Sequence, residues 1–126
     1  MMLNNVIISG RLTRDCEQRA TTGDYSVLKF SIAYNEYRNV NGEFQETTDY
    51  YDVEFWTRYP ERKAPKLVKG AFVEIDGALK TDKWEKDGKT QKKVIIKANK
   101  VHLIKESKSP GASEPQQGLY DADIPF

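Results

Sequence analysis

The chain has 126 residues and a formal net charge of +1, and 38% of its residues are hydrophobic and 11% aromatic. This composition excludes a wholly disordered chain and predicts one small folded domain with, at most, a tail. The only cysteine, Cys16, excludes an intramolecular disulfide and indicates a reducing compartment, and the apolar run in residues 1–11 is too short for a signal peptide or a membrane span. We therefore expect a cytoplasmic protein.

Short alternating patterns separated by turn residues predict an all-β domain. We expect strands at residues 5–12, 26–37, 47–56, 72–81 and 94–104, with residues 17–20 continuing the first strand after a bend. Asn41-Gly42 predicts a tight hairpin between the second and third strands, and Asp87-Gly88 a turn within a charged loop at 82–93. A short helix should begin near Pro60, and Pro65 excludes a long one. Five strands with a short helix between the third and fourth match a five-stranded Greek-key barrel of the OB type.

Strand alternation also predicts which side chains face the core. Gly10 should mark a bulge or a close backbone approach, and Val27 should face outward. The residues expected to face inward are Val6, Ile8, Gly10, Leu12, Leu28, Phe30, Ile32, Tyr34, Val73, Ile75, Gly77 and Leu79.

The strand at 47–56 has two different faces. Tyr51, Val53 and Phe55 alternate onto a face that can be buried. Tyr50, Asp52, Glu54 and Trp56 alternate onto the other face, which places two large rings among carboxylates. Such a face is suited to flat partners, although cross-strand aromatic packing is an alternative explanation for any single ring.

Trp84 lies among lysines in a segment too polar to be core. The surrounding lysines are Lys80, Lys83, Lys86, Lys89, Lys92 and Lys93. Aromatic rings can stack on unpaired bases while ammonium groups replace the counterions of phosphates, so the pattern favours binding of a single-stranded nucleic acid. For the lysines alone, a solvated hairpin is the alternative.

The composition changes after residue 106. Residues 107–126 carry one lysine and three carboxylates, a net charge of −2, which leaves +3 for residues 1–106 with 19 basic and 16 acidic side chains. We expect a folded domain at 1–106, a flexible linker at 107–118 and an acidic tip at 119–126 in a disordered tail.

Over nearly its whole length the chain resembles the bacterial and phage single-stranded DNA-binding proteins. The resemblance is carried by NNVIISGRL and DCEQR near the start, FSIA at 30–33, the aromatic third strand, VEIDGALKTDKW at 73–84 and DADIPF at the end. It implies an OB-fold protomer in a homotetramer that coats and protects single-stranded DNA, in the cytoplasm, either associated with the nucleoid or in the host if phage-encoded. No cofactor, metal or catalytic residue is implied.

The resemblance assigns base stacking to four rings and phosphate contacts to two lysines. The rings are Tyr37, Tyr50, Trp56 and Trp84, and the lysines are Lys80 and Lys83. Lys86 and Lys92 in the same hairpin join them as candidate contacts. Asp52, Glu54 and Asp82 depart from the family pattern and should repel phosphate, which predicts weaker affinity or a shifted DNA path. Tyr51 falls where the family makes subunit contacts.

In the family the tip docks on replication, recombination and repair proteins. Here Ile124 and Phe126 supply apolar anchors, Pro125 restricts them, and Asp121 and Asp123 seek a basic rim.

The residues leave two other functions open. A metal-dependent nuclease could be assembled from the strand carboxylates with Lys80, but alternating acids on exposed strands are usually solvated. An RNA-binding OB module would also stack bases, and the acidic tip argues against it.

Overall fold

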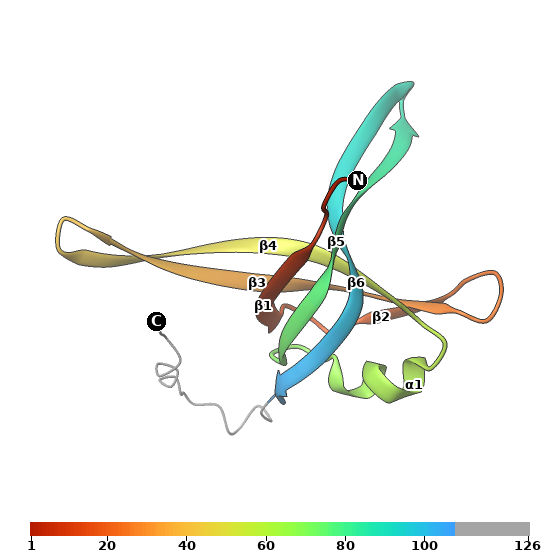
Figure 1. Ribbon diagram of the computed structural model, residues 1–126, viewed down its shortest axis with the longest axis horizontal. Helices are drawn as coiled ribbons and strands as arrows, with labels where there is room; N and C mark the ends of the chain where they lie inside the picture. Colours follow the sequence, from red (N-terminus) through yellow and green to blue (C-terminus); the bar gives the residue numbers. More distant parts are fainter. Residues whose placement is uncertain (108–126) are drawn as a thin grey trace.

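Six strands and one short α-helix form the part of the chain that the structure describes, residues 1–107 of a computed structural model (Figure 1). The strands are β1 (Val6–Leu12), β2 (Glu17–Ala20), β3 (Ser26–Val40), β4 (Glu43–Thr57), β5 (Phe72–Lys86) and β6 (Lys89–Lys105). The helix α1 (Pro60–Lys63) is followed by a 3-10 turn, η1 (Ala64–Lys66). The predicted linker at 107–118, except Ser107, and the predicted tip at 119–126 lie outside the described residues.

Five of the strands close into a barrel in the order β1, β5, β6, β4, β3. Closure comes from the pairing of β1 with β3 at Arg11↔Ala33 and Leu12↔Ile32. The β4 and β6 strands pair in parallel, as Val53↔Ile96 shows, and the other ladders of the barrel are antiparallel. The predicted OB-type barrel is confirmed. Residues 17–20 form a separate strand that extends the sheet from β3.

Two glycines allow neighbouring strands to approach closely. A Cβ on Gly10 would lie 2.7 Å from the carbonyl oxygen of Ala33, which confirms the close approach predicted there. A Cβ on Gly77 would lie 2.3 Å from the carbonyl oxygen of Lys97, next to a shift in the β5–β6 register. Any larger residue at either position would push two barrel strands apart.

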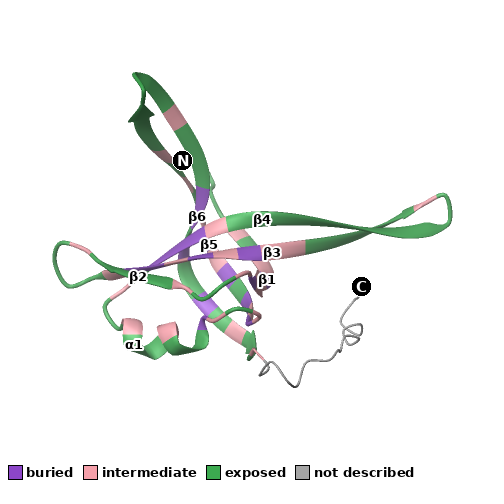
Figure 2. Cartoon of the chain, turned by 180° about the vertical axis from the view of Figure 1, so that it is seen from behind, coloured by how far each residue is buried: buried purple, intermediate pink, exposed green. Residues whose placement is uncertain are grey.

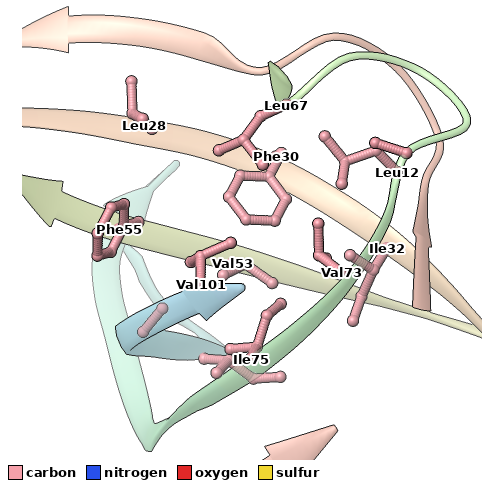
Figure 3. Packing of buried hydrophobic residues seen from close by; sticks show 13 residues of the cluster. Leu12, Leu28, Phe30, Ile32, Val53, Phe55, Leu67, Val73, Ile75 and Val101 are labelled. Atoms are coloured by element: carbon pink, nitrogen blue, oxygen red, sulfur yellow. The ribbon is translucent and has the colours of Figure 1, made fainter. Parts of the chain in front are cut away.

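The core lies inside the barrel, where inward-facing residues from the strands meet (Figure 3). Phe30 lies near its centre, and Leu67 from the segment after η1 is buried in the same cluster. The inward positions predicted for Leu28, Phe30, Ile32, Val73 and Ile75 are confirmed.

Two predictions about burial were wrong. Tyr51 and Leu79 are exposed because they lie at the end of the core, opposite Ile32 and Ile96, which are the last buried residues on those faces of β3 and β6. Val27 lies on the outer face, as predicted, but it is buried there, directly opposite Trp56 in the β3–β4 ladder.

Two long hairpins project from the barrel, β3–β4 and β5–β6 (Figures 1 and 2). The Asn41-Gly42 and Asp87-Gly88 turns have positive φ at all four residues, with 53° at Asn41 and 54° at Asp87. This backbone is typical of type I′ hairpin turns and confirms both predicted turns. Residues 82–93 were predicted as a loop, which was wrong: they pair regularly from Asp82↔Lys93 to Lys86↔Lys89. Both faces of this hairpin are largely exposed, so its strands carry polar residues at almost every position.

Candidate nucleic-acid interface

The strand β4 brings Trp56 onto the outer face of the barrel, next to residues of β3, β5 and β6. We define the outer face by the residues that the ladders place on the same side as Trp56: Val27, Lys29, Ser31, Asp52, Glu54, Lys80, Asp82, Lys93 and Ile95. Val27 and Ile95 are buried there, which gives this face a small apolar base beneath polar residues. An aromatic side chain on such a base is held in place while its ring remains partly open to solvent.

Glu54 connects the aromatic and the basic residues of the outer face. Its side chain is nearly buried, with the residue only 8% exposed. The Trp56 Nε1 donates a hydrogen bond to Glu54 Oε1 at 3.4 Å, and the ammonium groups of Lys29 and Lys80 lie 3.6 and 3.7 Å from the carboxylate. Lys80 Nζ also lies 6.0 Å from the centre of the Trp56 ring. The carboxylate therefore orients the indole and holds two cations beside it.

Asp52 and Asp82 are also paired with lysines. Lys93 forms an ion pair with Asp52, whose carboxylate accepts a hydrogen bond from Ser31 Oγ, and Lys80 lies 3.8 Å from Asp82. Burial alone would raise the pKa of Asp52, but the hydrogen bonds from Lys93 and Ser31, with the charges of Lys93 and Arg14, hold it below its ordinary value of 3.8. The three carboxylates expected to repel phosphate are thus each partnered by a cation.

The β3–β4 hairpin carries the second pair of candidate rings. Tyr37 lies opposite Glu46 and donates a hydrogen bond from its hydroxyl to Glu46 Oε2 at 3.2 Å, and Tyr50 lies opposite Ala33. Tyr37 is 51% exposed and Tyr50 is 67% exposed, compared with 36% for Trp56 and 44% for Trp84. The alternation of the ladder places Tyr37 and Tyr50 on the same side of the sheet as Trp56.

Sequence reasoning missed one exposed ring in this hairpin. Phe44 is 79% exposed and lies opposite Asn39, on the same side of the ladder as Tyr37. Counting back from Tyr50 in steps of two would have reached it, but the strand was predicted to begin only at residue 47.

The β5–β6 hairpin divides the predicted lysines between its two faces. Lys80, Trp84 and Lys86 alternate onto one face. Lys83 and Lys92 lie directly opposite each other on the other face. A strand of nucleic acid that stacks on Trp84 therefore meets Lys80 and Lys86 directly, whereas Lys83 and Lys92 are reached only around the edge of the hairpin.

Among residues 1–107, no three acidic, histidine or cysteine side chains are grouped so that they could hold a metal ion. No helix in this part of the chain is long and apolar enough to cross a membrane. The predicted docking residues, Asp121, Asp123, Ile124, Pro125 and Phe126, lie outside the described residues.

Sequence comparisons identify relatives along most of the chain. The model of the single-strand binding protein family matches residues 3–104. The chain is 43% identical over 108 residues to the single-stranded DNA-binding protein of Aquifex aeolicus (strain VF5), which covers 85% of this chain and 74% of that protein. It is 32% identical over 120 residues to the single-stranded DNA-binding protein of Treponema pallidum (strain Nichols), and the match covers 95% of this chain and 68% of that protein.

Solved structures show the same architecture. A deletion mutant of the single-stranded DNA-binding protein from Thermus aquaticus is similar with a TM-score of 0.71 and 28% identity, over 82% of this chain and 51% of that chain. This chain therefore spans about half of that protein. A Plasmodium falciparum SSB in complex with ssDNA is similar with a TM-score of 0.69 and 27% identity, over 83% of this chain and 96% of that chain. By its sequence and its barrel, the chain belongs to the single-strand binding protein family.

Proposed function

We propose that this protein binds single-stranded DNA without sequence preference, by stacking bases on exposed rings and contacting phosphates with lysines. The observation that carries the proposal is the series of exposed rings on one side of the β3–β4 ladder, Tyr37, Tyr50 and Trp56, together with Trp84 in the lysine-rich hairpin. Stacking on a ring is worth about 1 to 3 kcal/mol per base and is tolerant of base identity. The relatives named above, including one in complex with ssDNA, support this reading.

The phosphate contacts are proposed to come mainly from the edges of this surface. Lys29, Lys80 and Lys93 already have carboxylate partners in the free protein. Lys86 is exposed and lies on the Trp84 face, and Lys83 and Lys92 extend the contact to the other face of the hairpin. Binding should weaken as salt rises, because each phosphate contact releases counterions.

The larger biological role follows from the family resemblance. We propose that the protein coats and protects single-stranded DNA as a homotetramer during replication, recombination and repair, in the cytoplasm. The tip, Asp121 to Phe126, is proposed to recruit partner proteins. Deletion of residues 121–126 should abolish partner binding and preserve single-stranded DNA affinity; a loss of DNA affinity would contradict this assignment.

Tryptophan fluorescence tests the binding proposal directly. Titration with oligo-dT should quench the emission strongly at low salt, and duplex DNA and oligo-U should quench it less, because Trp56 and Trp84 are both proposed to stack. The double variant Trp56→Ala/Trp84→Ala should lose affinity in an assay that uses labelled DNA. Equal affinity of this variant and the wild type would refute the proposal, as would equal quenching by duplex.

A further inference from the structure

The β3–β4 ladder is followed by one more cross-strand contact beyond Trp56. Its last backbone pair at this end is Ser26↔Thr57, and the next residues on the two segments are Tyr25 and Arg58. The Arg58 guanidinium carbon lies 5.1 Å from the centre of the Tyr25 ring. The two side chains therefore continue the order of the ladder after its hydrogen bonds end.

Continued past the last ladder pair, the alternation assigns this pair to the side of the sheet that carries Trp56. Trp56 lies opposite Val27, and two residues further along each segment come Arg58 and Tyr25. Tyr25 directly precedes β3 and Arg58 directly follows β4, so the pair lies at the end of the ladder that carries Trp56. Tyr25 is 43% exposed, which is more than Trp56 at 36%.

The chemistry of the pair is that of the proposed DNA-binding rings. A tyrosine ring can stack a base, and an arginine can stack a base or contact a phosphate. Within residues 1–107 no carboxylate forms an ion pair with Arg58, in contrast to Lys80 and Lys93. A phosphate at Arg58 therefore displaces no carboxylate of the described chain.

We propose that the surface for single-stranded DNA extends past Trp56 to Tyr25 and Arg58, which bind one further nucleotide. Tyr25 stacks the base, and Arg58 contacts the adjoining phosphate while keeping the Tyr25 ring in place. This extension rests on the proposed single-stranded DNA binding.

The chain offers a matched control for this pair. Tyr59 is 49% exposed and is covered by Arg62, whose guanidinium carbon lies 4.3 Å from the ring centre. Tyr59 is the N-cap of α1 and Arg62 lies within the helix, so this pair does not face across from one strand segment to another. The control has the same chemistry and similar exposure in a different place.

The test is a length series of oligo-dT, titrated into the full-length wild type and three variants. Tyr25→Ala should lose about 5- to 150-fold in affinity for oligonucleotides long enough to reach Tyr25, and nothing for short ones that reach only Trp56. Tyr25→Phe and Tyr59→Ala should match the wild type at every length. With long oligonucleotides, Arg58→Gln should reduce the slope of log affinity against log salt by the amount that corresponds to about one phosphate contact.

The outcomes separate this inference from the proposed function. If no oligo-dT quenches the wild type, single-stranded DNA binding itself fails. If the wild type binds but Tyr25→Ala matches it at all lengths, or loses no more than Tyr59→Ala, the extension is overturned. A Tyr25→Ala loss that is independent of length also overturns it, and the melting temperature of each variant excludes misfolding as the cause.

Discussion

Replacing Glu54 by glutamine removes the charge that holds two lysines beside Trp56. Glutamine keeps an oxygen that can accept the hydrogen bond from Trp56 Nε1, so the indole should stay in place. The ammonium groups of Lys29 and Lys80, now 3.6 and 3.7 Å from the carboxylate, lose that partner and become available to phosphate. We therefore expect Glu54→Gln to bind single-stranded DNA more tightly at low salt than the wild type.

The size of the effect follows from the number of lysines released. Each phosphate contact on a single strand contributes about 0.7 to the slope of log affinity against log salt. Two released lysines would steepen that slope by about 1.4, but Lys80 keeps Asp82 as a second partner at 3.8 Å. The expected change lies between about 0.7 and 1.4. Both lysine side chains are about two-fifths exposed, so the free energy of unfolding should change by less than about 1 kcal/mol.

The assay is a set of oligo-dT titrations over a range of salt concentrations, followed by tryptophan fluorescence. Glu74→Gln is the matched control, because it changes the net charge equally at an exposed position of β5 opposite His102, away from Trp56. Its slope should equal that of the wild type. An unchanged slope for Glu54→Gln, or the same change in both variants, would refute the argument that Glu54 holds these lysines away from phosphate.

Three further predictions address the barrel, its acid stability and the exposed ring of Phe44. Gly77→Ala should lower the free energy of unfolding by about 1 to 3 kcal/mol, because its Cβ would lie 2.3 Å from the Lys97 carbonyl oxygen. Urea denaturation measures this change, and an unchanged midpoint would contradict the prediction. The pKa of Asp52 is lowered in the folded state, so its contribution to stability is present above 3.8 and is lost as the pH falls through the folded-state value. Asp52→Asn should therefore weaken the dependence of unfolding free energy on pH in that range, and an identical dependence would exclude the assignment. Phe44→Ala should reduce affinity for long oligo-dT without changing the melting temperature, and equal affinity would show that this ring does not stack.

The hairpins show what local sequence can and cannot predict. Asn41-Gly42 and Asp87-Gly88 were recognised because a type I′ turn needs positive φ at both central residues, a requirement that few residues meet. The lengths of the strands were underestimated because alternation of apolar and polar residues vanishes where both faces meet water. For the same reason the sequence analysis did not include Phe44 in a strand and assigned residues 82–93 to a loop.

The positions of the stacking rings could be predicted from the sequence, but the ion pairs of the candidate site could not. The alternation of side chains along one strand predicts that Tyr50 and Trp56 share a face. The same rule applied to β5 would have assigned Lys80 and Lys83 to opposite faces. Lys29 lies directly opposite Glu54 in the β3–β4 hairpin, but Lys80 comes from β5, which only the closed barrel brings to Glu54, so the full set of ion pairs around Glu54 was not predictable in this way. Pairings between distant strands require the register, which the sequence pattern leaves open.

The pairing of charges on the outer face bears on how the protein should discriminate among its ligands. Lys29, Lys80 and Lys93 are matched by three carboxylates, so the centre of this face offers a phosphate little net attraction. A duplex presents phosphates but keeps its bases stacked inside, and it gains little from such a surface. A single strand can place its bases on the rings, where each is worth about 1 to 3 kcal/mol. Because carboxylates already balance their charges, the central lysines add little general attraction to nucleic acid. Stacking on the rings depends less on these charges, so the arrangement favours single strands over duplex.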